Sequence, residues 1–211
     1  AGRVTEGVNP KTGDAESRTC AEDQPFSARV FKTLADPFVG KLSLIKVTSG
    51  VLAPDTQLYN ANAEKAEKAG GIYFQRGKKQ TPAPRVVAGD LCAVAKLTTV
   101  NTGSTLCDPG KPVRFGDLEF PKPCISMAVY AKKAGDEDKI FSGLNRLMEE
   151  DPTIRVEKDV ETTESILSGL GELHLEVISK KLAAKFGAEA VLQYPKIPYR
   201  ETIRKKIDVQ G

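Results

Sequence analysis

Turn-forming residue pairs divide the first half of the chain into short apolar segments. Five such pairs occur: Ser49-Gly50, Pro54-Asp55, Gly70-Gly71, Gly89-Asp90 and Gly103-Ser104. The two longest segments, Phe26–Leu34 and Lys41–Thr48, flank a turn at Asp36–Gly40. Many short strands with turn signals this frequent are typical of a closed β-barrel. We therefore expect a β-barrel over residues 25–120.

Three segments around the expected barrel have a different composition. Residues 1–24 are rich in Gly, Glu and Asp and predict an extended leader or linker. Residues 61–69 (ANAEKAEKA) allow a helical turn, but the segment is too short and polar to be more than an excursion from the sheet. Prolines recur at Asp108–Pro112 and at Pro121–Pro123, which predicts a stiff linker after the barrel.

The hydrophobic period changes from strand-like to helical after Cys124. Within Asp136–Glu150, four apolar residues lie on one helical face: Ile140, Leu144, Leu147 and Met148. Glu172–Phe186 repeats the pattern with Leu175, Ile178, Leu182 and Phe186, and Gly187 follows as a helix cap. Strand-like runs flank these helices at residues 124–129, 153–157, 164–168 and 190–193. This βαββαβ order predicts an α+β, ferredoxin-like sandwich over residues 121–198.

The two ends of the chain read as cuts within a longer protein. The sequence begins Ala1-Gly2-Arg3, without methionine, and it stops soon after a strand-like segment, Tyr199–Ile203. We expect residues 199–211 to be the truncated start of a next domain.

Length and charge restrict the class of protein. The 211 residues suit two domains of about 100 residues each. The formal charge is only +3, so a general nucleic-acid binder is excluded and any RNA contact should be local; no DNA partner is expected. There is no run of 18 apolar residues and no signal peptide, which favours a cytoplasmic protein without a membrane partner.

No complete catalytic or metal site is visible. The four cysteines, Cys20, Cys92, Cys107 and Cys124, form no CxxC pair, so we expect reduced thiols and no zinc. Neither GxxxxGK[ST] nor a GxGxxG after a strand occurs. Glu172 and Glu176 flank the single histidine, His174, but residues two positions apart lie on different helix faces, so this spacing does not orient its ring for catalysis. We therefore expect no enzyme activity, metal or cofactor in this chain.

Basic residues in the barrel have two readings. Arg29, Lys32, Lys41 and Lys46 come from the first two long strands, and Arg76, Lys78 and Lys79 form a second cluster. Arg29 and Lys32 differ in strand parity, as do Lys41 and Lys46, so they do not automatically share a face. A solvated surface is the simpler interpretation. A contact that follows an RNA backbone is the sharper one.

Eight motifs in order resemble consecutive domains of elongation factor G. In the barrel they are Asp36–Leu42, Val47–Gly50, Ala88–Asp90 and Thr102–Asp108; after it they are Phe120–Pro123, Glu150–Thr153, Gly169–Leu175 and Tyr199–Ile203. The resemblance covers residues 25–207 and implies domain II, domain III and the start of domain IV of a translational GTPase. Residues 68–85 depart from the family pattern, with Gly71, Pro82 and Pro84 at unusual places.

The resemblance implies a function for the fragment. In this family the barrel docks on small-subunit ribosomal RNA and protein, and domain III relays the state of a preceding GTPase domain, which binds GTP and Mg. By position, the ribosome-binding residues would be Arg29, Lys32, Asp36, Phe38, Gly40, Lys41, Ser49 and Gly50. The relay residues would be Gly169, Gly171, Glu172 and His174. We expect a fragment that serves tRNA and mRNA translocation. A ribosome-protection or recycling GTPase and a small-ligand regulatory module are the alternatives.

Overall fold

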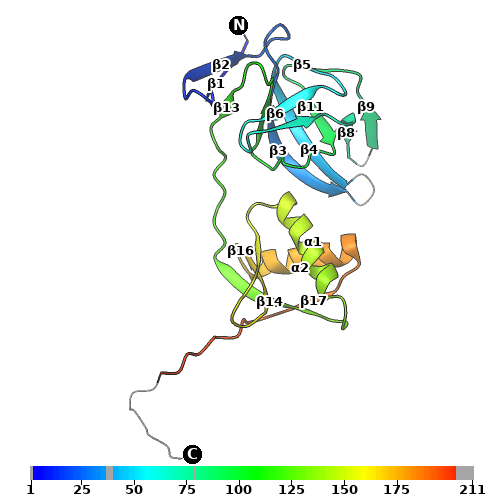
Figure 1. Ribbon diagram of the computed structural model, residues 1–211. Coiled ribbons are helices and arrows are strands. Elements are labelled where there is room, and N and C mark those ends of the chain that lie inside the picture. Colours follow the sequence, from blue (N-terminus) through cyan, green and yellow to red (C-terminus); the bar gives the residue numbers. More distant parts are fainter. Residues whose placement is uncertain (1, 37–39, 78, 203–211) are drawn as a thin grey trace, which may run out of the picture. The chain divides into compact units, whose positions relative to one another are not determined.

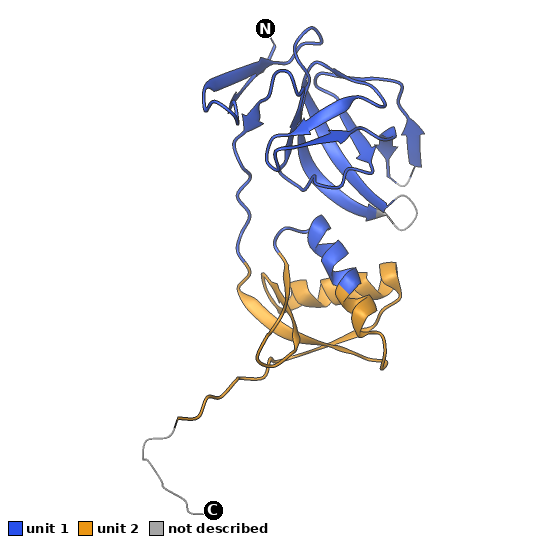
Figure 2. Ribbon diagram, in the orientation of Figure 1, with its two compact units in different colours: residues 1–122, 142–153 blue, residues 123–141, 154–211 orange. Residues whose placement is uncertain are grey.

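The structure is a computed structural model that describes residues 2–36, 40–77 and 79–202 (Figure 1). Contacts group the chain into two compact units (Figure 2). The first contains residues 1–122 and 142–153, and the second contains residues 123–141 and 154–211. The boundary between residues 122 and 123 lies within the linker expected at Pro121–Pro123. The limits of the domains themselves stay predictions.

An eight-stranded antiparallel sheet forms most of the first unit. Its strand order is β7-β6-β12-β3-β4-β11-β8-β9. The strands are β3 (Ser27–Asp36), β4 (Gly40–Ser49), β6 (Gln57–Asn60), β7 (Lys65–Lys68), β8 (Ile72–Arg76), β9 (Lys79–Pro82), β11 (Leu91–Ala95) and β12 (Thr105–Cys107). Two short strands, β5 (Val51–Leu52) and β10 (Val86–Val87), pair separately.

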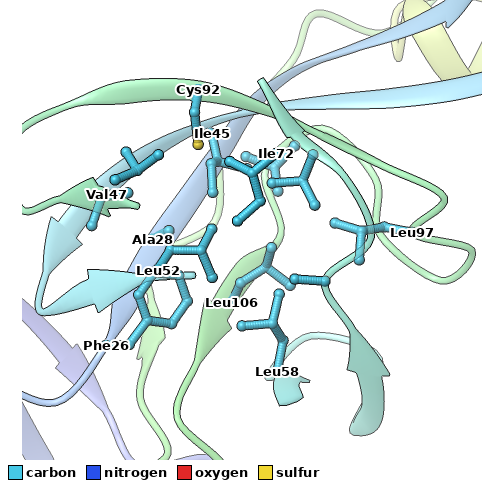
Figure 3. Packing of buried hydrophobic residues seen from close by; sticks show 14 of the residues in the cluster. Phe26, Ala28, Ile45, Val47, Leu52, Leu58, Ile72, Cys92, Leu97 and Leu106 are labelled. Atoms are coloured by element: carbon cyan, nitrogen blue, oxygen red, sulfur yellow. The ribbon is translucent and has the colours of Figure 1, made fainter. Parts of the chain in front are cut away.

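The largest hydrophobic cluster of this unit lies on one face of the curved sheet. Strand alternation points Val30, Ile45 and Cys92 inward, and all three are almost fully buried. Figure 3 shows their neighbours Leu52, Leu58, Ile72 and Leu106 converging from other strands. Each fully buried side chain of this size stabilises the fold by about 1.5–3 kcal/mol. The predicted fold class, a translation-factor type of β-barrel followed by an α+β unit, is confirmed; a ladder joining β7 to β9 is not found among the described residues.

Residues 1–24 are folded, whereas the sequence predicted a leader or linker. Strands β1 (Val4–Val8) and β2 (Ala15–Thr19) form a hairpin, and β1 also pairs with β13 (Arg114–Phe115). Arg18 attaches the hairpin to the barrel, because its buried guanidinium donates to the carbonyl oxygen of Lys111 at 2.8 Å. This contact spans 93 positions in the sequence, so local composition gave no signal of it.

Residues 61–69 form a turn and a strand rather than a helical excursion. The Asn60 side chain accepts hydrogen bonds from the backbone N–H groups of Asn62 and Ala63, which starts the turn. In β7, Glu67 then accepts bonds from the backbone N–H groups of Thr98 and Thr99. These tertiary bonds override the weak helical preference of the segment.

The second unit has the predicted ferredoxin-like strand order. Its antiparallel sheet runs β15-β16-β14-β17. The strands are β14 (Ile125–Ala131), β15 (Arg155–Lys158), β16 (Ser165–Gly169) and β17 (Ala190–Gln193). Helix α1 (Glu137–Glu150) connects β14 to β15, and α2 (Glu172–Phe186) connects β16 to β17. This is the predicted βαββαβ arrangement.

Both helices bury the apolar faces that the sequence indicated. In α1, which has residues in both units, Ile140, Leu144 and Leu147 are at most 3% exposed. In α2, which contacts β16 and β17, Leu175, Ile178 and Leu182 are buried. Helix α2 ends as predicted at Gly187, which adopts a left-handed conformation and donates its N–H to Ala183 O.

A carboxylate ties the last described segment to the second unit. Glu164 is 6% exposed, accepts from the Tyr130 hydroxyl and also accepts from the backbone N–H of Lys196 at 3.0 Å. These bonds lower the pKa of Glu164, with the Tyr130 bond as the largest cause. Residues 199–202 form no strand, and the rest of the expected next-domain segment lies outside the described residues.

Candidate functional site

A β-bulge at Phe31 determines which side chains lie on the surface of β3. In the β3–β4 ladder Val30 pairs with Ile45 and Lys32 pairs with Leu44, so Phe31 has no partner. Val30 and Thr33 are buried, whereas Phe31 and Lys32 are exposed. The extra residue lets two successive side chains point outward.

The bulge brings together basic residues that strand parity alone would separate. Arg29 pairs with Lys46, and Lys32 pairs with Leu44, two residues from Lys46 on the same strand face. Leu91 pairs with Lys46 from the other side. We call this surface the outer face; it consists of Arg29, Phe31, Lys32, Lys46 and Leu91. Lys46 and Leu91 were not among the predicted site residues.

Arg29 is held in position by two contacts. One nitrogen of its guanidinium donates to the carbonyl oxygen of Gly116 at 2.5 Å. The guanidinium carbon also lies 5.6 Å from the centroid of the Phe115 ring, a cation–π contact. A guanidinium has five N–H donors, so this geometry leaves donors directed elsewhere while the group is fixed.

The structure describes three of the predicted residues at the β3–β4 turn, Asp36, Gly40 and Lys41. Asp36 pairs with Gly40 at the end of the ladder, and Gly40 is exposed with φ of +83°. Phe38 lies outside the described residues. Lys41 has the opposite parity to Lys46, is half-buried and donates to Asn101 Oδ1 at 3.1 Å. The structure therefore does not place Lys41 on the outer face.

Ser49 and Gly50 are buried and have structural contacts. Ser49 Oγ donates to Pro25 O at 2.6 Å and lies 2.6 Å from Ser27 Oγ. At Gly50, φ is +72° and an added Cβ would come within 2.6 Å of the carbonyl oxygen of Gln24. The predicted RNA contact here stays a prediction, but the Ser49 side chain is not part of the accessible surface.

The second basic cluster lies at a hairpin end. Arg76 pairs with Lys79 across the β8–β9 turn, and both are exposed. Lys78 is outside the described residues. Exposed cations at a hairpin tip are consistent with a solvated surface and equally with a contact to an RNA backbone.

The predicted relay residues surround the start of α2. Gly171 precedes the helix, Glu172 is exposed in its first turn, and His174 Nδ1 accepts from the backbone N–H of Leu170 at 3.2 Å. His174 therefore caps a backbone donor next to the helix start. At Gly169, an added Cβ would lie 2.6 Å from Leu175 Cδ2 and 3.1 Å from His174 Nδ1. The glycine is needed for this close approach.

An exposed apolar cluster accompanies the relay residues. Leu170, Leu173 and Val177 are 41%, 74% and 40% exposed. Leu173 and Val177 are four positions apart and adjacent on the helix surface. The sequence could have indicated their exposure, because these apolar residues lie outside the stripe of Leu175, Ile178 and Leu182 that forms the core.

Two of the four cysteines, Cys92 and Cys107, have the environment of structural thiols. Cys92 and Cys107 are buried and Cys124 is exposed. Burial, with a contribution from Asp90, raises the pKa of the Cys92 thiol to about 12. Among the described residues, no group of three or more His, Cys, Asp or Glu side chains is arranged to hold a metal ion. Over the same ranges, neither helix has the length and apolar content to cross a membrane.

Comparison with protein families assigns both halves of the chain. The model of elongation factor G domain 2 matches residues 25–121, and the model of elongation factor G domain III matches residues 120–194. The chain belongs to the elongation factor G family. The match to domain 2 includes residues 68–85, within which β8 and β9 lie.

A solved structure is similar to most of this chain. A crystal structure of a protein from Thermus thermophilus is 34% identical, with a TM-score of 0.72. The similarity covers 86% of this chain and 27% of that protein. The chain thus spans about a quarter of the related protein and contains two consecutive domains of a translation elongation factor.

Proposed function

We propose that this chain binds the ribosome and relays conformational change within a translational GTPase that promotes translocation of tRNA and mRNA. The observation that carries the proposal is the presence of elongation factor G domains II and III, side by side in one sequence. The fold and the positions of the charged residues support separate roles for the two domains.

The barrel is the proposed ribosome anchor. Arg29, Lys32 and Lys46 share the outer face. Arg29 is the direct cross-strand partner of Lys46, and Lys32 pairs two positions farther along β4, with Leu44. Cations with this spacing neutralise successive phosphates of small-subunit ribosomal RNA, and most of the binding free energy of such contacts is electrostatic. Ribosomal protein next to that RNA is a further expected partner, with Gly40 and Lys41 at the adjoining turn.

The start of α2 is the proposed relay surface. Leu170, Leu173 and Val177 present apolar side chains to solvent, while His174 and Gly169 fix the turn beneath them. An exposed apolar cluster of this kind fits a protein partner. We assign that partner to the GTPase domain of the whole protein, which would bind GTP and Mg and carry out hydrolysis. This chain would not hydrolyse GTP, and the whole protein would act in the cytoplasm.

Co-sedimentation with purified ribosomes at low and moderate salt tests the anchor. We expect the 211-residue chain to pellet with ribosomes in a salt-sensitive manner, because phosphate contacts release counterions. Arg29→Ala, Lys32→Ala and Lys46→Ala should each weaken pelleting and reduce the salt dependence, by about one phosphate each. Lys41→Ala tests the turn in the same assay.

Lys65→Ala is the matched control, since Lys65 is an exposed lysine of β7 away from the outer face. It should pellet like the unmodified chain. Absence of pelleting at low salt would contradict ribosome anchoring by this chain. Equal effects of the Lys65 and Lys46 substitutions would contradict a specific role for the outer face.

A further inference from the structure

A cavity of about 490 Å³ opens in the first unit where the N-terminal hairpin meets the outer face. Arg3 and Cys20 line it from the hairpin side, and Arg29, Phe31, Lys46 and Leu91 line it from the sheet. Its volume lies within the range of about 300–1,000 Å³ that ligand pockets occupy. Among the described residues of the turns at Asp36–Lys41 and Thr48–Gly50, Thr48 is the one that lines it.

The lining combines positive charge with exposed apolar surface. Arg3, Arg29 and Lys46 provide three cations, and no carboxylate occurs among the described residues that line the cavity. Phe31 is 44% exposed and Leu91 is 55% exposed, so an aromatic ring and an aliphatic side chain both face solvent here. A ligand that fits both features is anionic at one end and flat and apolar at the other.

We infer that this cavity takes one unpaired nucleotide of RNA, with its base against Phe31 and its phosphate between Arg29 and Lys46. The inference rests on the proposed ribosome-binding function and specifies the RNA element that is bound. Bases that are splayed out of a helix stack on aromatic side chains, whereas duplex bases do not offer their faces.

The positions of the two cations support a phosphate between them. Arg29 and Lys46 are direct cross-strand partners, and like charges at such positions repel. Arg29 cannot swing away, because its contacts with Gly116 and the Phe115 ring fix it. A bound phosphate would satisfy both cations, and Arg presents planar donors suited to phosphate oxygens.

A nucleotide within a strand suits the surface better than a free mononucleotide or an acidic peptide. Lys32 continues the positive surface along β3 beyond the cavity, where the next phosphate of a strand would lie. A mononucleotide has no group for Lys32 to contact. An acidic peptide would satisfy the cations but would leave the exposed Phe31 ring without a stacking partner.

The test uses two RNA hairpins of one sequence, which differ in whether a single 2-aminopurine is bulged or paired. Binding of the 211-residue chain is measured by anisotropy of a terminal dye, and stacking is measured by quenching of the 2-aminopurine. We expect at least about tenfold tighter binding of the bulged hairpin, with quenching. Phe31→Ala should weaken that binding about tenfold, because base–aromatic stacking is lost. Phe31→Tyr, which keeps the ring, should retain it.

Two further variants separate charge from stacking. Lys46→Ala should weaken binding of the bulged hairpin, whereas Lys65→Ala should leave it unchanged. Phe31 and Lys46 are both exposed, so the variants should stay folded, and a cooperative thermal unfolding transition checks this. Equal affinity for the two hairpins, or binding of neither, overturns the inference. Adenosine monophosphate that binds as tightly as the bulged hairpin also overturns it.

Ribosome co-sedimentation distinguishes failure of this inference from failure of the proposed function. If the chain pellets with ribosomes but binds the two hairpins equally, the outer face binds RNA without a nucleotide pocket and only the inference fails. If the chain does not pellet while the bulged hairpin binds selectively, the cavity is assigned correctly and ribosome anchoring is what fails.

Discussion

Arg29 and Lys46 stand directly opposite each other in the β3–β4 ladder. Like charges at such positions destabilise a sheet, whereas opposite charges stabilise it by about 0.2–1 kcal/mol. Lys46→Glu should therefore raise the free energy of unfolding by about that amount. The same change should weaken ribosome pelleting, because it replaces a phosphate-binding cation. Urea denaturation measures the first effect and co-sedimentation the second.

Lys65→Glu is the control for that substitution. Lys65 pairs with the uncharged Asn60, so the new carboxylate gains no cross-strand cation from that residue. A Lys46→Glu variant that is less stable than Lys65→Glu would show that the repulsion between Arg29 and Lys46 is not significant.

Two predicted site glycines should respond differently to alanine. Gly50 has φ of +72°, and its added Cβ would come within 2.7 Å of Phe26 Cα, so backbone strain and overlap act together. We expect Gly50→Ala to destabilise the first unit by about 2–5 kcal/mol. Gly40 has φ of +83° but open space, so Gly40→Ala should cost only about 1–2 kcal/mol. Thermal and urea unfolding compare the two; equal losses would contradict the role of overlap at Gly50.

The buried thiol of Cys92 should make the barrel sensitive to alkali. Its pKa is raised from 9.0 in the unfolded chain to about 12 in the fold, so the folded state holds the proton more tightly. The associated stability is fully present below pH 9 and is lost as pH rises toward 12. Cys92→Ala should lower stability at about pH 8 but show a shallower decline between about pH 9 and 11. Urea unfolding at each pH measures it, and an unchanged decline would exclude Cys92 as a cause.

Glu164 should give the second unit a dependence on acid. The Tyr130 hydroxyl and the Lys196 N–H both stabilise its carboxylate, and the folded pKa is lowered from 4.5. Its contribution to stability is present above pH 4.5 and is lost as pH falls through the lowered folded value. Glu164→Gln should remove this part of the acid dependence while keeping an oxygen acceptor for Tyr130.

Thermal unfolding between about pH 3 and 7 checks this prediction. Glu157→Gln is the control, because Glu157 is an exposed residue of β15 in the same sheet. The Glu157 variant should keep the acid dependence of the unmodified chain. If the Glu164 variant kept it as well, the bonds from Tyr130 and Lys196 to Glu164 would not contribute to the pH dependence of stability.

The second unit followed from its sequence because its signals are local. The apolar stripe of α2 repeats within one helix, and Gly187 supplies the left-handed cap that ends it. The order of elements along the chain, β-α-β-β-α-β, followed in the same way from the alternation of helical and strand-like segments. Each of these features depends on residues only a few positions apart, and so they are visible in the sequence.

The parts that sequence reasoning missed depend on distant contacts. Arg18 reaches Lys111, and Glu67 reaches the backbone of Thr98 and Thr99, across intervals that no local pattern records. Parity arguments likewise failed to group Arg29 with Lys32, since they assume a ladder without interruptions. Of the candidate site, the sequence identified the basic residues of β3 and singled out Lys46 as a basic residue of the facing strand, although it did not include Lys46 in the predicted ribosome-binding set. It did not identify Phe31 or Leu91.

Because of the bulge, the aromatic ring of Phe31 can be lost by mutation without moving the basic residues of the outer face. Because Phe31 has no partner in β4, its deletion would leave Arg29 opposite Lys46 and Lys32 opposite Leu44, in a ladder that is continuous from Ala28 to Asp36. No other residue of β3 would change face. An insertion in β4 beside Leu44 would instead turn Lys32 toward the core. A descendant one residue shorter here would thus keep its positive surface and lose its aromatic one, which makes base stacking a trait that can be gained or lost in a single step.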